Sequence, residues 1–313
     1  MLRDCYSRGR RLFLAGYFCC GLLPGAWLVP AAADVLVHDD TGREVRLAAP
    51  ARRIVSLAPH LAELVFAAGA GDALVGVSAH SDYPARVRDL PRVGSGQGLD
   101  LERILALRPD LVLAWESGNP SSALRRLEAL GLVLYRSEPG GLDSIAANLE
   151  QIGTLAGTGA EARRAAREYR AGLAALRERY AERRPVRVFY QLWHPPLLTL
   201  GGGHWLNDAL RVCGAENVFG DWPRQVLTLD VEAVLARDPE LLLVTGVGAS
   251  PGTALDLWKA WPALDAVAEG RLLWLPVERL HRPTPRILEE VEVLCRHIDG
   301  ARGDGERNHT RAP

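Results

Sequence analysis

The sequence predicts an α/β fold: two lobes, each built on a parallel sheet, joined by a long helical segment. Three observations predict this fold. They are an internal repeat, an alternation of strand-like and helix-like runs in each half, and a stretch without glycine or proline between the halves. With 313 residues, of which 48% are hydrophobic, the chain is long enough for two domains that each bury a core.

The internal repeat is the strongest of these observations. Residues 99–113 read LDLERILALRPDLVL and residues 229–243 read LDVEAVLARDPELLL, with no gap between the two patterns. Each copy starts with an acidic helix cap, Asp100 or Asp230, and continues as a short amphipathic helix that passes through a proline into an apolar strand. The duplication therefore predicts two lobes of similar architecture.

A strand and a helix are also expected before each copy of the repeat. Residues 53–57 and 186–191 are β-rich, and each run is followed by a turn and a helix that ends at Gly69 or Gly214. Strands that alternate with helices indicate parallel sheets with right-handed crossovers.

Between the halves lies a helical stretch from about residue 144 to residue 182. Residues 161–183 run without glycine or proline, which predicts one stiff helix about 30 Å long. A rigid rod between two lobes predicts small closing motions. We therefore divide the chain into a signal peptide (residues 1–33), an N-terminal lobe (34–138), a linking helix (139–184), a C-terminal lobe (185–299) and a disordered polar tail (300–313).

The first residues have the pattern of a secretory signal. A positively charged region with four arginines precedes an apolar stretch over residues 12 to about 29, and residues 31–33 are the small residues that signal peptidase needs. We expect cleavage near Asp34 and an exported protein. The alternative is a retained membrane anchor, but the glycines and the proline in the apolar stretch make a poor spanning helix.

Ligands of open parallel sheets bind beyond the carboxyl ends of the strands. The predicted ends are residues 59–60, 79–83 and 115–119 in the first lobe and residues 192–196, 246–248 and 278–282 in the second. If the two sets of ends face each other, they border a cleft that contains Tyr83, Trp115 and Trp193. Aromatic side chains suit a large planar or apolar ligand, although each tryptophan could equally fill a core.

Four histidines also fall in these segments: His60, His80, His194 and His281. Imidazole is a common metal ligand, so the cleft could hold a metal ion or the iron or cobalt of a cofactor. Turns also tolerate histidine, and no fixed spacing joins the four. The sequence alone therefore leaves both interpretations open.

Catalytic motifs are missing from the sequence. We find no Walker A loop, no HExxH motif, no nucleophile elbow and no pair of carboxylates at the spacing of an acid and a base. A hydrolase that uses the turn around Ser95 would lack a base. The formal net charge of -1 gives no excess of positive charge for nucleic acid. We therefore expect a binding protein with no catalytic residues, no cofactor, no metal site and no nucleic-acid partner.

Glu102 and Glu232 occupy equivalent positions in the two copies of the repeat. A carboxylate in the first turn of a helix gains about 0.3–1 kcal/mol from the helix dipole, which explains either residue alone. One exposed anion in each lobe could also dock on arginines of a membrane permease. In the exported chain the remaining cysteines, Cys213 and Cys295, could form a disulfide or remain as two buried thiols.

Several stretches together resemble the periplasmic cobalamin-binding protein family of ABC importers, over roughly residues 52–298. They are residues 55–59 (VSLAP), 63–69 (ELVFAAG), 75–78 (VGVS), 81–84 (SDYP), 97–104 (QGLDLERI), 109–112 (PDLV), 114–115 (AW), 212–219 (VCGAENVF) and 285–287 (PRI). The resemblance implies two lobes bridged by one helix, with a corrinoid of the cobalamin type held between them in the periplasm. It also implies an ABC permease and ATPase complex as the partner of a monomer.

The resemblance also implies roles for single residues. It assigns Glu102 and Glu232 to permease docking and pairs Cys213 with Cys295. Trp115 matches a tryptophan that contacts the corrin, and residues 278–282 match a contacting loop. Together with the predicted strand ends, the expected ligand contacts are His80, Tyr83, Trp115, Trp193, Glu278, Arg279, Leu280, His281 and Arg282.

This chain departs from the family pattern at three aromatic positions. A well-known member has tyrosine where this chain has His80 and tryptophan where it has Gly96, and a further tryptophan position falls here at Val226. Trp193, Trp205 or Trp222 could replace them. Haem, a ferric siderophore or a metal ion held by the four histidines are the alternative ligands.

Overall fold

The structure is a computed structural model that describes residues 34–95, 98–246 and 252–309. The predicted signal peptide and its cleavage position lie outside the described residues. Among the helices of the described segments, none combines the length and the apolar character needed to cross a membrane.

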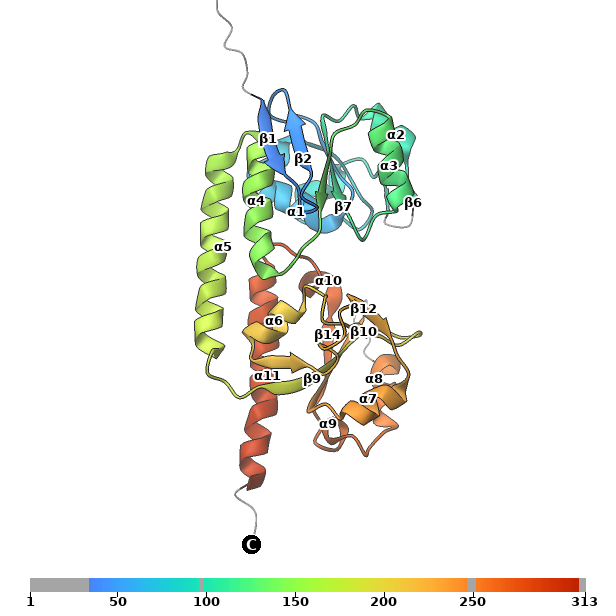
Figure 1. The fold of residues 1–313 in the computed structure, drawn as a ribbon, viewed down its shortest axis with the longest axis vertical. Coiled ribbons are helices and arrows are strands. Elements are labelled where there is room, and N and C mark those ends of the chain that lie inside the picture. The colour runs from blue at the N-terminus through green and yellow to red at the C-terminus, as the bar shows by residue number, and fades with distance from the viewer. Residues whose placement is uncertain (1–33, 96–97, 247–251, 310–313) are drawn as a thin grey trace, which may run out of the picture. The chain divides into compact units, whose positions relative to one another are not determined.

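The N-terminal lobe contains a four-stranded sheet of order β4-β3-β7-β8 in which all neighbours are parallel, as the alternation of strands and helices predicts (Figure 1). A β-hairpin and a two-stranded ribbon accompany this sheet. The elements are β1 (Val35–His38), β2 (Glu44–Leu47), β3 (Ile54–Ser56), α1 (Pro59–Ala67), β4 (Leu74–Val77), β5 (Gly94–Ser95), β6 (Gly98–Leu99), α2 (Leu101–Ala106), β7 (Leu111–Trp115), α3 (Ser121–Ala129) and β8 (Leu134–Ser137).

The C-terminal lobe has a mixed sheet of order β12-β10-β9-β13-β14, with β11 beside β9. Its strands are β9 (Val186–Trp193), β10 (Leu198–Leu200), β11 (Ala215–Asn217), β12 (Val226–Thr228), β13 (Leu241–Gly246) and β14 (Leu272–Pro276). The helices are α6 (Asn207–Val212), α7 (Val231–Arg237), α8 (Gly252–Lys259), α9 (Asp265–Ala268) and α10 (Val277–Leu280).

The predicted parallel sheet is correct for β9, β11, β13 and β14 and wrong for β10 and β12, which run antiparallel to their neighbours. The reason is the short connection between β9 and β10, since a few residues can join antiparallel strands but not parallel ones. The glycines after β10 allow a close backbone approach. A Cβ at Gly202 would lie 2.2 Å from the carbonyl oxygen of Gly220.

The segment between the lobes is two helices, α4 (Leu142–Ala156) and α5 (Gly159–Tyr180), where we expected one helical stretch over residues 139–184. The chain reverses at Gly157, whose φ of +73° is one that glycine adopts without strain. Helix α4 packs on α1 and β1 of the N-terminal lobe, and α5 lies beside α4 (Figure 1). Only α5, with 22 residues, is the predicted rod.

The last helix, α11, spans Ile287–His309. The prediction of a disordered tail over residues 300–313 is therefore wrong for residues 300–309, and residues 310–313 lie outside the described part. Ala301 is 5% exposed and belongs to the main apolar core, so it extends the buried face of α11 past Ile298. The polar composition of the last residues concealed this extension.

The main apolar core extends through both lobes, and each lobe has a smaller apolar cluster besides. Side chains alternate across each sheet, so that Leu111 and Leu113 join this core while Val112 and Ala114 pack with the helices on the outer face. In the second lobe Leu241 and Leu243 belong to the same shared core. Helices α4, α5 and α11 contribute to it as well, so the apolar interior continues from one lobe to the other.

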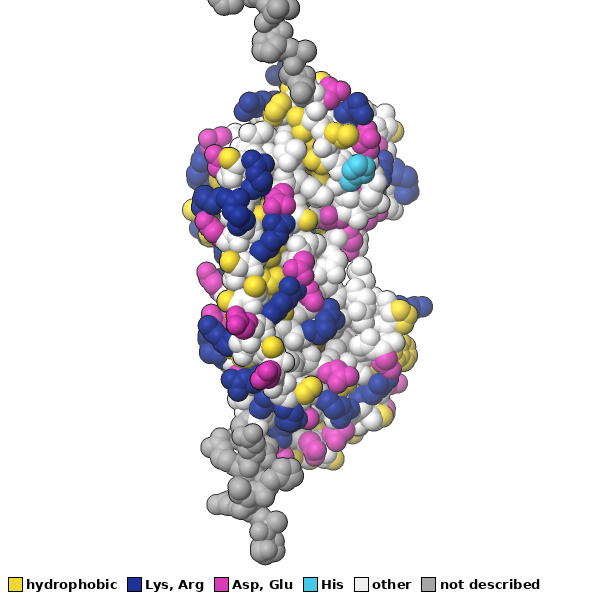
Figure 2. Space-filling model, turned by 60° about the vertical axis from the view of Figure 1, so that its left-hand side comes forward, with side chains coloured by type: hydrophobic (Ala, Val, Ile, Leu, Met, Phe, Trp, Pro, Cys, Tyr) yellow, Lys and Arg dark blue, Asp and Glu magenta, His cyan; other side chains and the backbone are white. Residues whose placement is uncertain are grey.

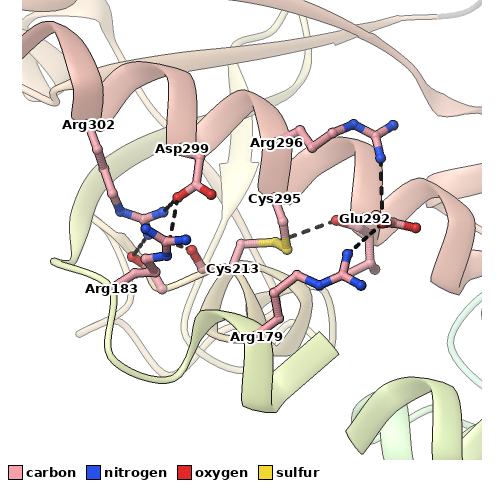
Figure 3. The surroundings of a disulfide bond; sticks show 10 residues. Arg179, Arg183, Cys213, Glu292, Cys295, Arg296, Asp299 and Arg302 are labelled. Atoms are coloured by element: carbon pink, nitrogen blue, oxygen red, sulfur yellow. Dashed lines mark hydrogen bonds and ion pairs between the residues drawn. A yellow bond between two sulfur atoms is a disulfide. The ribbon is translucent and has the colours of Figure 1, made fainter. Parts of the chain in front are cut away.

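A disulfide joins Cys213, which follows α6, to Cys295 in α11, the pairing that the family resemblance implies (Figure 3). Ion pairs surround it. Glu292 on α11 binds Arg179 at the end of α5 over 2.7 Å, and Arg302 donates to the carbonyl oxygen of Cys213 over 2.6 Å. These contacts fasten α5, α6 and α11 to one another.

Candidate ligand-binding site

The segment after β4 meets the segment after α10 where the two lobes adjoin, and the molecular surface is indented between the lobes (Figure 2). Trp115 ends β7 and is partly exposed. Its backbone N–H donates to Oδ1 of Asn119 over 2.8 Å, while Nδ2 of the buried Asn119 donates to the carbonyl oxygen of Leu57 over 3.1 Å. The loop after β7 is thereby tied to the neighbouring strand.

The indole of Trp115 occupies the space that a side chain at position 118 would need. A Cβ on Gly118 would lie 2.0 Å from Cε3 of Trp115, so only glycine leaves room for the ring in this position. On its other side the indole meets the imidazole of His60 edge to face, with 5.3 Å between the ring centroids.

His60, at the start of α1, is 4% exposed, and its Nε2 has no hydrogen-bond partner among the described residues. Burial and the nearby positive charge of Arg282 lower the pKa of His60 to about 3. The imidazole is therefore neutral at every physiological pH.

Four charged side chains meet at the boundary between the lobes. Glu63 and Asp82 belong to the N-terminal lobe, and Arg282 and Arg286 follow α10 in the C-terminal lobe; we refer to these four as the interlobe ion cluster. Arg282 Nη1 donates to Glu63 Oε1 over 2.8 Å and to Asp82 Oδ1 over 2.5 Å. Arg286 donates to both oxygens of Glu63, over 2.8 and 3.0 Å.

The side chains of the interlobe ion cluster differ in their exposure to solvent. The side chain of Glu63 is 3% exposed and that of Arg282 15%, whereas Asp82 is 55% exposed. Burial alone would raise the pKa of Asp82, but the hydrogen bond and the charge of Arg282 lower it overall. The guanidinium of Arg286 lies 3.6 Å from the ring centroid of Tyr83, a cation–π contact.

Two more of the predicted contacts also lie at the surface of this region. His80 is exposed, has a left-handed φ of 64°, and accepts a hydrogen bond from Arg282 Nη2 through its carbonyl oxygen over 3.3 Å. Trp193, at the end of β9, is 48% exposed and donates from Nε1 to the carbonyl oxygen of Pro195 over 3.2 Å. About half of the surface of Trp193 therefore remains available to a ligand.

The predicted contact stretch at residues 278–282 divides in the structure. Arg279 pairs with Glu290 of α11 over 3.2 Å, and Leu280 is buried in the main core. His281 is partly buried and its ring bonds to the hydroxyl of Tyr190 over 2.8 Å, and desolvation lowers its pKa to about 4. Helix α10 covers residues 278–280 of this stretch, while His281 and Arg282 lie in the turn that follows it, and the side chain of Glu278 lies outside what the structure describes. Arg282 is the member of this stretch placed at the lobe boundary.

The structure does not bring the four histidines together as a metal site. His60 is buried and His281 is partly buried, whereas His80 and His194 are exposed. In the described segments no group of three or more histidine, cysteine, aspartate and glutamate side chains is arranged to hold a metal ion.

Glu102 and Glu232 have matching positions in the two lobes. Each is exposed and is the second residue of its helix, α2 or α7, two positions after the cap residue. The side chains of Asp100 and Asp230 accept hydrogen bonds from the backbone N–H groups of Arg103 and Ala233, so both predicted caps are confirmed.

Glu63, Asp82 and Arg286 are members of the site that no sequence pattern identified. One signal was available, because Glu63 is a lone charge in an otherwise apolar run, ELVFAAG, and a buried carboxylate needs partners. Its partners follow more than two hundred residues later, and no periodicity joins positions so far apart.

Comparison with known proteins assigns the chain to a family. The sequence profile described as "Periplasmic binding protein" matches residues 54–278. The chain belongs to this family. A curated relative, the vitamin B12-binding protein of Vibrio cholerae serotype O1, is 40% identical over 250 residues, which cover 80% of this chain and 90% of the relative. The vitamin B12-binding protein of Yersinia pestis is 37% identical over 278 residues, which cover 88% of this chain and 95% of that protein.

Solved structures of this family share the fold. The periplasmic vitamin B12 binding protein BtuF of Vibrio cholerae aligns with a TM-score of 0.74 at 39% identity, covering 81% of this chain and 98% of that one. The periplasmic heme-binding protein RhuT from Roseiflexus aligns with a TM-score of 0.71 at 27% identity, covering 80% and 98%. The predicted two-lobed α/β fold and the family resemblance are thereby confirmed.

Proposed function

We propose that this protein captures a corrinoid of the cobalamin type in the periplasm and delivers it to the permease of an ABC importer. The observation that carries the proposal is the arrangement of the two lobes, in which Trp115 ends β7 of the N-terminal lobe and Arg282, after α10 of the C-terminal lobe, reaches Glu63 and Asp82 at the lobe boundary. Identity of 40% to a vitamin B12-binding protein over most of both chains supports the same ligand class.

The chemistry of these two side chains suits a corrinoid. A corrin is a large ring with an apolar face and amide side chains at its rim, so it can stack on an indole and accept hydrogen bonds from a guanidinium. Trp193 and Trp222 are 48% and 46% exposed, and we propose that they supply aromatic contacts where Gly96 and Val226 do not. Tyr83 and His80 complete the proposed contacts near Arg282.

Ligand identity is tested by titration. Cyanocobalamin, haemin and a ferric hydroxamate siderophore are added separately to the purified protein, and binding is followed by calorimetry and by visible absorption. The proposal predicts saturation by one equivalent of cyanocobalamin and weaker binding, or none, of the other two. Preferential binding of haemin would support the alternative that the ligand is haem. A heme-binding protein that is 27% identical to this chain has a similar structure.

We further propose that Glu102 and Glu232 dock on cationic side chains of the permease. Their support is their equivalent, exposed position at the start of α2 and α7, outside the proposed ligand contacts. We expect Glu102→Ala with Glu232→Ala to reduce uptake of cobalamin into vesicles that contain the transporter, because charge complementarity governs such encounters. Affinity for cyanocobalamin should stay unchanged. Normal uptake by the double variant would contradict the docking role.

The same proposal includes export by cleavage of residues 1–33 and a role without catalysis. We also propose that the protein is a monomer, and that its partners are the small-molecule ligand and the transporter complex. Mass spectrometry of the periplasmic fraction tests the export step, since the mature protein should begin near Asp34.

A further inference from the structure

We infer that Glu63 is a positioning residue whose buried carboxylate holds the guanidinium of Arg282 in the orientation that meets the ligand. The inference rests on the proposed function, in which Arg282 contacts the bound molecule. It adds a role for the N-terminal lobe, because Glu63 would act on the ligand only through a side chain of the other lobe.

The hydrogen bonds of Arg282 to described residues use three of its five N–H donors and leave Nε–H and one N–H of Nη2 without a protein acceptor. Nη1 donates to Glu63 and Asp82, and Nη2 donates to the carbonyl oxygen of His80. All three acceptors belong to the N-terminal lobe. Nε makes no hydrogen bond with any described residue, and it is not among the buried unpaired atoms of that part of the chain. The N-terminal lobe thus fixes the guanidinium and leaves Nε–H accessible to an acceptor on a ligand.

Glu63 is the centre of this arrangement. Its carboxylate accepts three hydrogen bonds, one from Arg282 and two from Arg286, and at 3% exposure water cannot replace them. The two arginines are balanced by two carboxylates. Loss of the charge on Glu63 would leave two adjacent guanidinium groups with only the exposed Asp82 between them, and both would move apart or toward water.

The position of Glu63 in α1 favours a role in orienting Arg282 over a role only in holding the two lobes together. It lies in α1, which begins with His60, and His60 contacts Trp115 edge to face. One helix therefore supports the aromatic contact at its start and the cationic contact one turn later. A carboxylate at this place sets where the polar contact lies relative to the indole.

A double-mutant cycle tests the inference. Affinity for cyanocobalamin is measured by calorimetry for wild type, Glu63→Gln, Arg282→Ala and the double variant. We expect Glu63→Gln to weaken binding about tenfold or more in the wild-type background and to have almost no further effect in the Arg282→Ala background. Thermal stability should fall in both backgrounds, so the two readouts separate positioning from structure.

The matched control is Glu150→Gln. Glu150 makes a bidentate pair with Arg170, at 2.6 and 3.0 Å, but it joins α4 to α5 away from the lobe boundary. This substitution should leave the affinity unchanged. If Glu63→Gln does not fold, Asp82→Asn serves instead, because Asp82 is exposed and holds the same guanidinium; we expect a smaller loss that also vanishes in the Arg282→Ala background.

The outcomes distinguish the inference from the proposed function. Equal losses from Glu63→Gln in both backgrounds, or unchanged affinity, would overturn the positioning role. Failure of the wild-type protein to bind cyanocobalamin would instead contradict the proposed function, and the four proteins would then be titrated with haemin, where the same coupling is expected if Arg282 contacts that ligand.

Discussion

At the scale of single residues, the position of the Trp115 side chain depends on two neighbouring residues that are not themselves proposed to contact the ligand. Asn119 ties the loop after β7 to β3, and Gly118 leaves the space that the indole occupies. A ligand-binding aromatic side chain needs such support, because a ring that rotates freely loses entropy on binding.

Gly118→Ala should displace the indole without removing any polar group. The added methyl group would overlap the Trp115 ring, so we expect affinity for cyanocobalamin to fall about fivefold, since aromatic contacts of this kind contribute about 1 kcal/mol. Calorimetry of Gly118→Ala and Trp115→Ala measures the effect. Gly131→Ala is an informative comparison because no atom lies within 4 Å of its Cβ, although its φ of +84° gives it a separate cost in stability. Unchanged affinity in Gly118→Ala would exclude this account of Trp115.

The buried histidines predict how stability depends on pH. Burial lowers the pKa of His60 to about 3 and that of His204 and His281 to about 4. Below about pH 6.5 the unfolded chain binds protons that the folded protein does not, so the free energy of unfolding must fall as the pH drops from 6.5 toward 4. Each histidine should contribute about 2 kcal/mol between pH 7 and pH 5.

Urea denaturation at pH 7 and pH 5 measures this dependence. His60→Leu is the matched variant, because Nε2 of the buried imidazole has no hydrogen-bond partner among the described residues. The difference in unfolding free energy between the two pH values should be smaller in this variant than in wild type. Equal differences would show that His60 is charged in the folded protein or neutral in the unfolded one.

The residues of the site were only partly predictable from the sequence. Trp115 and Arg282 could be placed at strand ends because strands and helices alternate regularly before them. Glu63 and its arginine partners could not be paired, since Arg282 is 219 residues away and only the folded chain brings them together. The surroundings of Arg279, Leu280 and His281 were also hidden, because one helical turn points successive side chains in different directions.

At the scale of elements, the repeat was the most informative part of the sequence. Helices α2 and α7 have the same acidic cap, and a residue with left-handed φ precedes the proline after each helix, Arg108 at 44° and Asp238 at 41°. The antiparallel strands β10 and β12 lie outside the two repeat copies at residues 99–113 and 229–243, so the duplication could not predict them. The division of the linking segment into α4 and α5 depends on Gly157, which the composition of the stretch did not distinguish from its neighbouring glycines.

The disulfide predicts a measurable contribution to stability. Cys213 and Cys295 close a loop with a sequence separation of 82, for which the chain-entropy model gives about 4 kcal/mol. Cys213→Ala with Cys295→Ala should therefore lower the free energy of unfolding by about this amount in urea denaturation, with ligand affinity preserved. A loss below about 1 kcal/mol would indicate that the ion pairs around Glu292 and Arg302 hold α11 in place without the bond.

At the scale of the whole molecule, the shared core limits how the lobes move. The apolar interior that includes Leu113 of one sheet and Leu243 of the other continues through α4, α5 and α11. Opening the lobes widely would expose part of it, at about 25 cal/mol for each Å². The interlobe ion cluster adds a second connection between the lobes. We therefore expect a ligand site that is formed before binding and changes little on binding.

The most direct test of this account is a crystal structure of the protein with cyanocobalamin. We predict one corrinoid at the boundary of the lobes, stacked on Trp115 and hydrogen-bonded to Nε of Arg282, with the bonds between Glu63 and both arginines retained. Electron density for the ligand at another place on the protein, or a corrinoid that touches neither Trp115 nor Arg282, would contradict it.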